Sequence, residues 1–354
     1  MRSTSPSNNQ TDLLSYSFGE SMPLADLAPF ARDMLFYQKR KKEKCRLVSP
    51  PKFDAPVADT HAHLDMLDNP ALALARSAFY GIKFICTIVD VQEDDRTTFE
   101  QLDSWFEEAK RIYDSYELPG FELAKPKVRV GIGCHPHNAK FYDDALEEKL
   151  LQDLRDPRVA AIGEVGLDYH YDHSPRPEQR EAFRRQIRLA HKTGLPLLLH
   201  MREAHDDGFA ILQEEGFPEA GVLLHCFNLD PAILKPWVEA GCYVAFGGPV
   251  TFKKSPEVGE SALQVPLDRL LTETDSPFMT PEPQLNCANC MDAPRSMSSA
   301  VFLSNSSTMP VRCSIGSLPH GKLGNTGRLS LRSGKMQQCC NKDRGCASRT
   351  WQPC

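Results

Sequence analysis

The stretch RVAAIGEVGLDYHYDHSPRPEQREAFRRQIRLAHKTGLPLLLH, residues 158–200, decides the fold. It begins and ends with continuous apolar runs, at 158–168 and 195–200, which are typical of strands buried on both faces. Between them Phe183, Ile187 and Ala190 recur at helical spacing, and Gly194 follows where a glycine can end a helix. The stretch therefore predicts a strand–helix–strand unit with two parallel strands.

The same alternation repeats on both sides of this unit. Further apolar runs lie at residues 57–65, 83–90, 127–135, 221–227, 242–248 and 268–275, which brings the total to eight. Most of the intervals between these runs have helical character. Eight parallel strands that alternate with helices within about 220 residues predict an α/β fold, a closed (β/α)8 TIM barrel. We expect this barrel to occupy residues 51–281.

The two ends of the chain differ from this pattern. Residues 1–50 are expected to be an N-terminal extension with a short helix within 24–38 and a basic run, KRKKEKCR (39–46). Such a run fits a solvated linker best, with a nucleic-acid contact or a nuclear address as alternatives. Residues 282–354 are rich in Cys, Ser, Gly and Pro without apolar periodicity, which predicts a disordered or aberrant tail where the final barrel helix belongs. Cys287 and Cys290 have zinc-pair spacing, but no second pair follows them.

Composition narrows the class of protein. The 354 residues are 41% hydrophobic and 25% charged, as in globular proteins. No apolar run approaches the roughly 18 residues that a membrane helix needs, and no secretory signal is visible, so we expect the cytosol, with the nucleus as the alternative. The net charge is −6, and because residues 282–354 carry +6, residues 1–281 carry −12. Such an acidic body can act on polyanions if bound metal ions supply positive charge locally.

Histidines and carboxylates stand at the carboxyl ends of the predicted strands, the face on which TIM barrels carry out chemistry. His61 and His63 form a His-x-His pair on the first strand, and alternate residues of a strand point to the same side. The ends of four further strands carry Glu164, His200, His225 and Asp275. A lone histidine at a strand end is more often structural, but six such side chains together predict a site for one or two divalent ions. Zn, Mn, Fe, Co and Mg are the candidates.

A second group of polar residues fits contacts with substrate. His135 ends the third strand and Arg202 lies two residues beyond His200, so both are predicted to bind a substrate phosphate. Three other residues are weaker candidates for the site, and two histidines are expected to be exposed loop residues. The weaker candidates are Asp168, His137 and Glu203, and the loop residues are His170 and His173.

The motifs DTHAHLD, GCHPH, IGEVGLDY, LPLLLHMREA, GVLLHCF and ETDSPFMTP, in this order, resemble the TatD-type metal-dependent deoxyribonucleases. That family belongs to the amidohydrolase-like barrel superfamily, and the resemblance covers residues 56–281. It implies hydrolysis of phosphodiester bonds in DNA, often from the 3′ end, with divalent metals. It also implies two ion positions that share Glu164. His61, His63, Glu164 and Asp275 would surround one ion, and Glu164, His200 and His225 the other.

We therefore expect a dinuclear site in which metal-bound hydroxide attacks the phosphate, with Asp275 as general base and Glu164 as bridge. His135 and Arg202 would stabilise the transition state. DNA is the expected partner, with weak sequence specificity, and the sequence leaves the oligomeric state open, a monomer included. Two alternatives stay open: a metallohydrolase acting on amides, lactones or small phosphate esters, and a catalytically impaired product, because the tail replaces the family's final basic loop and helix.

Overall fold

The computed structural model describes residues 18–48, 56–94, 96–116 and 126–282. Eight strands form one sheet in which every neighbouring pair is parallel and the spatial order follows the chain. Each strand overlaps the apolar run that predicted it, and the predicted TIM barrel is confirmed. The strands are β4 (Val57–Ala62), β5 (Ile82–Asp90), β6 (Lys127–Gly133), β7 (Val159–Asp168), β8 (Leu197–Arg202), β9 (Val222–Leu224), β10 (Tyr243–Phe246) and β11 (Leu270–Thr272).

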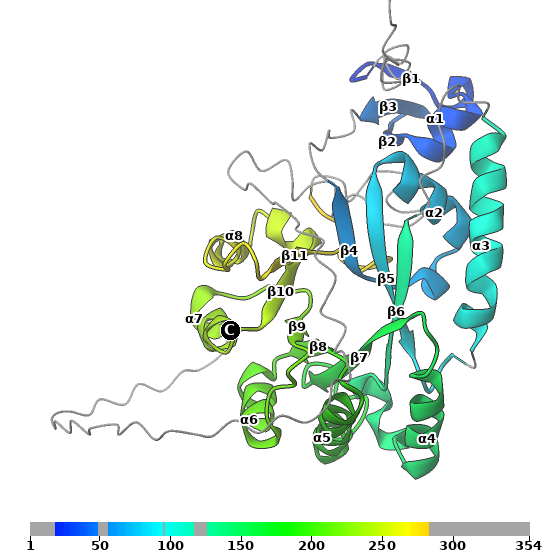
Figure 1. Cartoon of the computed structure of the whole chain (residues 1–354). Coiled ribbons are helices and arrows are strands. Elements are labelled where there is room, and N and C mark those ends of the chain that lie inside the picture. Colours follow the sequence, from blue (N-terminus) through cyan, green and yellow to red (C-terminus); the bar gives the residue numbers. More distant parts are fainter. Residues whose placement is uncertain (1–17, 49–55, 95, 117–125, 283–354) are drawn as a thin grey trace, which may run out of the picture. The chain divides into compact units, whose positions relative to one another are not determined.

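Helices occupy the connections and lie outside the sheet (Figure 1). The central helix, α5, ends at Gly194, whose φ of +69° is left-handed, as the sequence predicted. None of the helices in the described ranges is long and apolar enough to cross a membrane. The helices of the barrel are α2 (Pro70–Phe79), α3 (Thr97–Asp114), α4 (Asp144–Asp153), α5 (Arg176–Thr193), α6 (His205–Glu215), α7 (Pro231–Glu239) and α8 (Pro256–Ala262), with short 3-10 helices η3 (Leu64–Met66), η4 (Pro136–Phe141) and η5 (Gly248–Thr251).

Two apolar layers explain why the strands are hydrophobic on both faces. Cys86, Ile88 and Leu198 belong to a small cluster that fills the inside of the barrel. A larger cluster packs the outer face of the strands against the helices, with Phe183 and Ile187 of α5 fully buried in it. Alternate residues of each strand therefore serve different layers, and neither face is left for solvent.

Hydrogen bonds between the first and last strands close the barrel. Thr60 Oγ1 donates to the carbonyl oxygen of Thr272 (3.0 Å), and Thr272 Oγ1 donates to the carbonyl oxygen of Ala58 (2.6 Å). The buried Asp59 carboxylate accepts from Thr274 Oγ1 (2.6 Å) and from the Thr274 backbone N–H (3.0 Å). Strand β11 is thus fastened to β4 by side chains. The expectation that the final helix is missing falls on residues outside the described ranges. Cys287 and Cys290 also lie outside these ranges.

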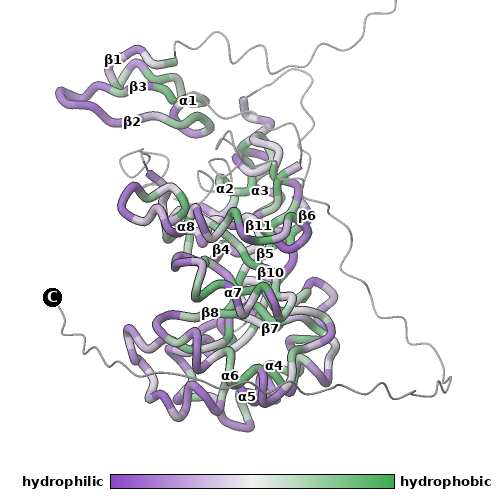
Figure 2. Tube along the Cα trace, turned by 90° about the vertical axis from the view of Figure 1, so that its left-hand side faces the viewer, coloured by the Kyte–Doolittle hydropathy of each residue, from purple (hydrophilic) through white to green (hydrophobic). Residues whose placement is uncertain are grey.

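The expected basic linker is wrong, because residues 39–46 form most of a β-hairpin. In the second strand of the hairpin the buried Cys45 and Leu47 alternate with Lys44 and Arg46, so the charges mask a strand pattern of period two. Figure 2 shows the hydrophilic turn of this hairpin, where Lys42 and Glu43 have positive φ. The elements before the barrel are β1 (Ser21–Pro23), η2 (Leu24–Asp26), α1 (Pro29–Met34), β2 (Phe36–Arg40) and β3 (Lys44–Val48), and the three strands form an antiparallel sheet.

This small sheet is attached where α2 and α3 end. The ring of Phe36 stacks on that of Tyr80 at 5.1 Å, just beyond the last residue of α2. Beyond the last turn of α3, the Tyr116 hydroxyl donates to Asp33 Oδ2 (2.6 Å). The ends of these helices lead back to the start of the next strand, so the sheet lies at the end of the barrel where strands begin. The carboxyl ends of the strands remain uncovered by it.

We predict that Thr274→Val destabilises the protein by about 1–3 kcal/mol, because it removes a hydrogen bond from a buried carboxylate at the closing strands. The free energy of unfolding in urea, measured without metal, tests this. Thr193→Val is the control, because it removes a threonine hydrogen bond to the Leu189 carbonyl at the end of α5. Equal losses in the two variants would contradict a special role for the contact between Asp59 and Thr274.

A pH dependence follows from His205. Burial lowers its pKa from 6.5 to about 4, although Asp206 acts in the opposite direction. The unfolded state therefore binds a proton before the folded state does, so stability from this residue is complete above pH 6.5 and is lost as the pH falls toward 4. We expect wild type to lose up to about 3 kcal/mol more than His205→Leu across this range in EDTA. Parallel curves for the two proteins would contradict the prediction.

Candidate metal centre

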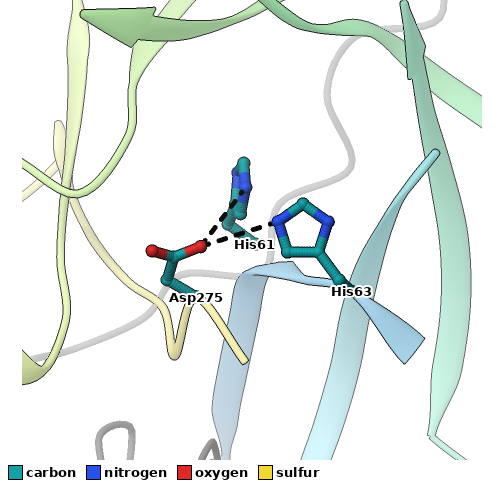
Figure 3. Close-up of side chains that lie close together, drawn as sticks. All are labelled: His61, His63 and Asp275. Carbon is teal, nitrogen blue, oxygen red and sulfur yellow. Dashed lines mark ion pairs between the residues drawn. The ribbon is translucent and has the colours of Figure 1, made fainter. Parts of the chain in front are cut away.

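One group of ligand atoms lies between the first and last strands. His61 ends β4 with His63 two residues on, and Asp275 follows β11 (Figure 3). Asp275 Oδ1 lies 3.9 Å from His61 Nε2 and 3.6 Å from His63 Nε2. Glu164 Oε2 approaches the same two nitrogens, at 3.3 Å and 3.8 Å. These four residues, which we call the first cluster, surround one point.

The other oxygen of Glu164 faces a different group. Glu164 Oε1 lies 2.6 Å from His200 Nδ1, 2.8 Å from His225 Nε2 and 3.8 Å from His135 Nε2. We call Glu164, His200, His225 and His135 the second cluster. The six residues predicted as ligands are therefore brought together, and Glu164 belongs to both clusters.

The first cluster fits a divalent ion. Ligand atoms about 2.0–2.2 Å from a tetrahedral zinc ion lie roughly 3.3–3.6 Å apart, close to the observed separations. His61 is fully buried, and neither of its ring nitrogens has a hydrogen-bond partner in the described part of the chain. A buried nitrogen without a partner is costly unless an ion binds it. In the second cluster the distances of 2.6 and 2.8 Å are hydrogen bonds, which an ion would replace.

The charges of these groups suit ligation. Burial alone would raise the pKa of Glu164, but the imidazoles of His225, His61 and His200 lower it well below its ordinary value. Burial lowers the pKa of His61, aided by His225 and opposed by Glu164. Glu164 is therefore an anion and His61 a neutral ring, which are the forms that bind a metal.

Asp168, a weaker candidate in the sequence, contacts the ring of His200 on the side away from Glu164. Its Oδ2 lies 3.2 Å from His200 Nε2 and 2.9 Å from His137 Nε2, while its Oδ1 accepts the backbone N–H groups of His170 and Tyr171. Burial acts to raise its pKa, but these hydrogen bonds from His137 and His200 lower it. An anionic Asp168 fixes the proton of His200 on Nε2 and leaves Nδ1 free to ligate.

His135 is placed differently from the other imidazoles. Its Nδ1 accepts the backbone N–H of His137 at 3.2 Å, and burial lowers its pKa well below 6.5. A neutral ring whose Nδ1 accepts a hydrogen bond carries its proton on Nε2. His135 therefore presents an N–H donor to the second cluster, which suits a phosphate oxygen better than a metal.

A cavity of about 470 Å³ opens over both clusters. Arg202, at the end of β8, lines it, and its guanidinium lies over the ring of Tyr171 at 4.6 Å. No described carboxylate forms an ion pair with Arg202, so its charge faces the cavity. His173 stacks on Tyr171 (5.4 Å), and His170 pairs with the exposed Glu203 (2.7 Å). His170, His173 and Glu203 thus stay outside the two clusters.

Local backbone geometry brings these side chains to one place. Asp275 and Cys226 have φ of +55° and +45°, in the left-handed region that few side chains adopt. A side chain at Gly166 would meet the carbonyl oxygen of His200 at 2.1 Å, so glycine lets β7 pass close to β8. Glu164 and His200 therefore lie side by side on neighbouring strands.

Sequence reasoning missed Glu273. Its side chain is completely buried, and Oε1 lies 3.6 Å from His225 Nδ1. The signal was present, because Glu273 precedes Asp275 by two residues and residues two apart in an extended chain share a face. Asp90, whose pKa burial raises to about 6, was also missed; its Oδ2 accepts the backbone N–H of His135 (2.7 Å).

The chain is similar to several known proteins. The family model described as TatD related DNase matches residues 58–297. A Bacillus subtilis protein named uncharacterized metal-dependent hydrolase YabD is 43% identical over 159 residues, which are 44% of this chain and 61% of that protein, less than two thirds of its length. The human 3′-5′ RNA nuclease TATDN2 is 33% identical over 65% of this chain and 30% of its own length. The crystal structure of YJJV, a TatD homolog from Escherichia coli, shares the fold, with a TM-score of 0.55, 24% identity and coverage of 70% and 88%.

We predict that Glu164→Ala removes tight binding at both ion positions, because its two oxygens face the two clusters separately. The loss of affinity should exceed the roughly 10–100-fold that removal of an outer hydrogen-bond partner causes. His63→Ala is the matched variant and should weaken only the first cluster. Metal content after dialysis against a defined free metal concentration measures both, and retention of two ions by Glu164→Ala would contradict the prediction.

Proposed function

Because the chain belongs to the TatD family of metal-dependent hydrolases, we propose that it is a deoxyribonuclease that removes nucleotides from the 3′ end with two divalent ions. The observation that carries this proposal is the position of Glu164. Its two carboxylate oxygens face two separate groups of imidazoles, 3.3 Å from His61 on one side and 2.8 Å from His225 on the other. A single glutamate can thus serve two neighbouring ions.

The proposed reaction needs a base beside the phosphate. The ions would lower the pKa of a water molecule and offset the charge of the phosphate. Asp275 is the base, since its carboxylate lies at the first cluster beside the cavity. Burial would raise the pKa of Asp275, but the neighbouring His63 and the other imidazoles lower it. Asp275 is therefore anionic and can accept the water's proton.

Two cationic or donor groups are available for the phosphate oxygens. The His135 Nε2–H points into the second cluster, and the Arg202 guanidinium lines the same cavity. Stacking on Tyr171 holds Arg202 in place without neutralising it. Both groups would stabilise charge that grows on the phosphate during attack.

The rim of the cavity supports a nucleotide substrate. Large hydrophobic side chains are exposed at six positions of the described chain, and three of these line this cavity: Met66 (44% exposed), Tyr171 (50%) and Phe278 (46%). Flat or flexible apolar surfaces beside a phosphate site suit stacking with nucleobases. A lactone or a small phosphate ester would leave much of this apolar surface exposed to solvent.

RNA is the second candidate substrate. The human relative is named as an RNA nuclease, and none of the contacts described above is specific to a deoxyribose. The same centre would hydrolyse either backbone, so the choice depends on how the cavity accommodates a 2′-hydroxyl group.

We expect the full chain, supplied with Mn²⁺, to shorten 5′-labelled single-stranded DNA stepwise. Gel analysis of matched DNA and RNA oligonucleotides measures rate and direction together. Asp275→Asn should slow the reaction by on the order of 100-fold or more while leaving the circular dichroism spectrum unchanged. The exposed surface variant Glu239→Gln, on α7, is the matched control and should cleave at the wild-type rate.

A panel of a lactone, an amide and a small phosphate triester distinguishes the alternatives. Hydrolysis of one of these at a higher kcat/KM than DNA or RNA would overturn the nuclease proposal. Cleavage of RNA at a higher kcat/KM than DNA would replace the proposed substrate but keep the reaction.

A further inference from the structure

The completely buried carboxylate of Glu273 has no ordinary partner. Neither of its oxygens forms a hydrogen bond within the described residues, and no lysine or arginine among them pairs with it. Its one ion-pair contact is Oε1 to His225 Nδ1, at 3.6 Å. A buried carboxylate with so little compensation is costly, and a fold retains one where a nearby group requires it.

Two stacked imidazoles lie next to this carboxylate. The rings of His61 and His225 are 3.9 Å apart and inclined by only 13°. One nitrogen of each ring and one oxygen of Glu273 lie within 4.8 Å of one another. His61 belongs to the first cluster and His225 to the second, so a single anion adjoins both ion positions.

The contact between Glu273 and His225 resembles that between Asp168 and His200, but Glu273 has fewer partners than Asp168. Asp168 holds His200 from behind while also accepting hydrogen bonds from His137 and two backbone N–H groups. Among the described residues, the polar groups that face the Glu273 carboxylate are the imidazoles of His225 and His61.

We infer that Glu273 is a positioning residue for the metal centre. Glu273 Oε1 lies 3.6 Å from His225 Nδ1, beyond ordinary hydrogen-bond distance, but its charge favours a proton on Nδ1, which has no hydrogen-bond partner among the described residues. When an ion replaces the contact of Nε2 with Glu164, the lone pair of Nε2 would then face the second ion position. Because His61 stacks on His225, fixing one ring also restrains the other. This inference rests on the proposed metal centre and assigns its second cluster two imidazoles, His200 and His225, each held from behind by its own carboxylate.

Metal affinity tests the inference without reference to catalysis. Titration of the metal-free full chain with Zn²⁺ against a competing chelator should give about 10–100-fold weaker binding at the second cluster in Glu273→Leu. The first cluster should weaken less. Glu273→Gln keeps an acceptor oxygen and should lie between wild type and Glu273→Leu. Asp153→Asn on α4, which alters a buried carboxylate paired with Arg96, is the control and should bind Zn²⁺ like wild type.

A spectroscopic signature separates positioning from a general loss of structure. In the Zn²⁺-loaded wild type with ¹⁵N-labelled histidine, His225 should show a protected Nδ1–H resonance, assigned by its absence in His225→Gln. This resonance should exchange rapidly in Glu273→Leu. If Glu273→Leu does not fold, Glu273→Gln decides, through weaker binding and faster exchange than in wild type.

Zn²⁺ affinities within twofold of wild type in the folded variants, together with an unchanged Nδ1–H resonance, would overturn the inference. Failure of the nuclease proposal is distinguishable, because it would leave Zn²⁺ binding dependent on Glu273 while no nucleic acid is cleaved.

Discussion

The contact between the first and last strands of the barrel is the constraint on which the metal centre depends. Asp275 and the two histidines of the His-x-His pair are more than 200 residues apart in sequence, yet the Asp275 N–H donates to the His61 carbonyl (2.8 Å) and the His63 N–H to the Ser276 carbonyl (2.7 Å). The first cluster therefore forms only when the barrel closes. Glu164 and His200 of the second cluster lie within β7 and β8, and His225 directly follows β9. Because these strands are neighbours within the sheet, the second cluster is less dependent on closure.

Closure also concentrates buried negative charge. Asp59, Glu164, Asp168, Glu273 and Asp275 are all buried around the barrel mouth or just beneath it, and each is compensated differently. Asp59 has threonine and backbone donors, and burial raises its pKa to about 7. Asp168 has four N–H groups, whereas Glu164, Glu273 and Asp275 face imidazoles. Carboxylates whose nearest partners are imidazoles rather than lysines or arginines favour a cation between them, which is how an acidic protein can approach a phosphate.

The features that could be predicted from the sequence are those that a pattern of residue types along the chain contains. All eight strands were recognised because each is apolar on both faces. The six ligand positions were proposed because each was expected to end a strand, although Glu164 lies four residues before the end of β7. The N-terminal hairpin was missed because Lys44 and Arg46 alternate with Cys45 and Leu47 and conceal their period. The spacing from Asp275 could have indicated Glu273 as a candidate, but the roles of Asp168 and Glu273 depend on which imidazole nitrogen lies nearest a carboxylate on another strand. That distance is set by strand register and ring rotation, which leave no trace in residue spacing.

The position of the N-terminal sheet limits where substrate can be held. It packs where α2 and α3 end, at the end of the barrel where strands begin, and in TIM barrels that end serves stability while the opposite end serves chemistry. The positive charge of residues 39–46 is therefore directed away from the two clusters and cannot offset a phosphate bound there. In the proposed reaction, positive charge at a bound phosphate would come from the ions and from Arg202. Discrimination between substrates would then depend on the short segments that line the cavity. His137, Tyr171 and Phe278 belong to these segments.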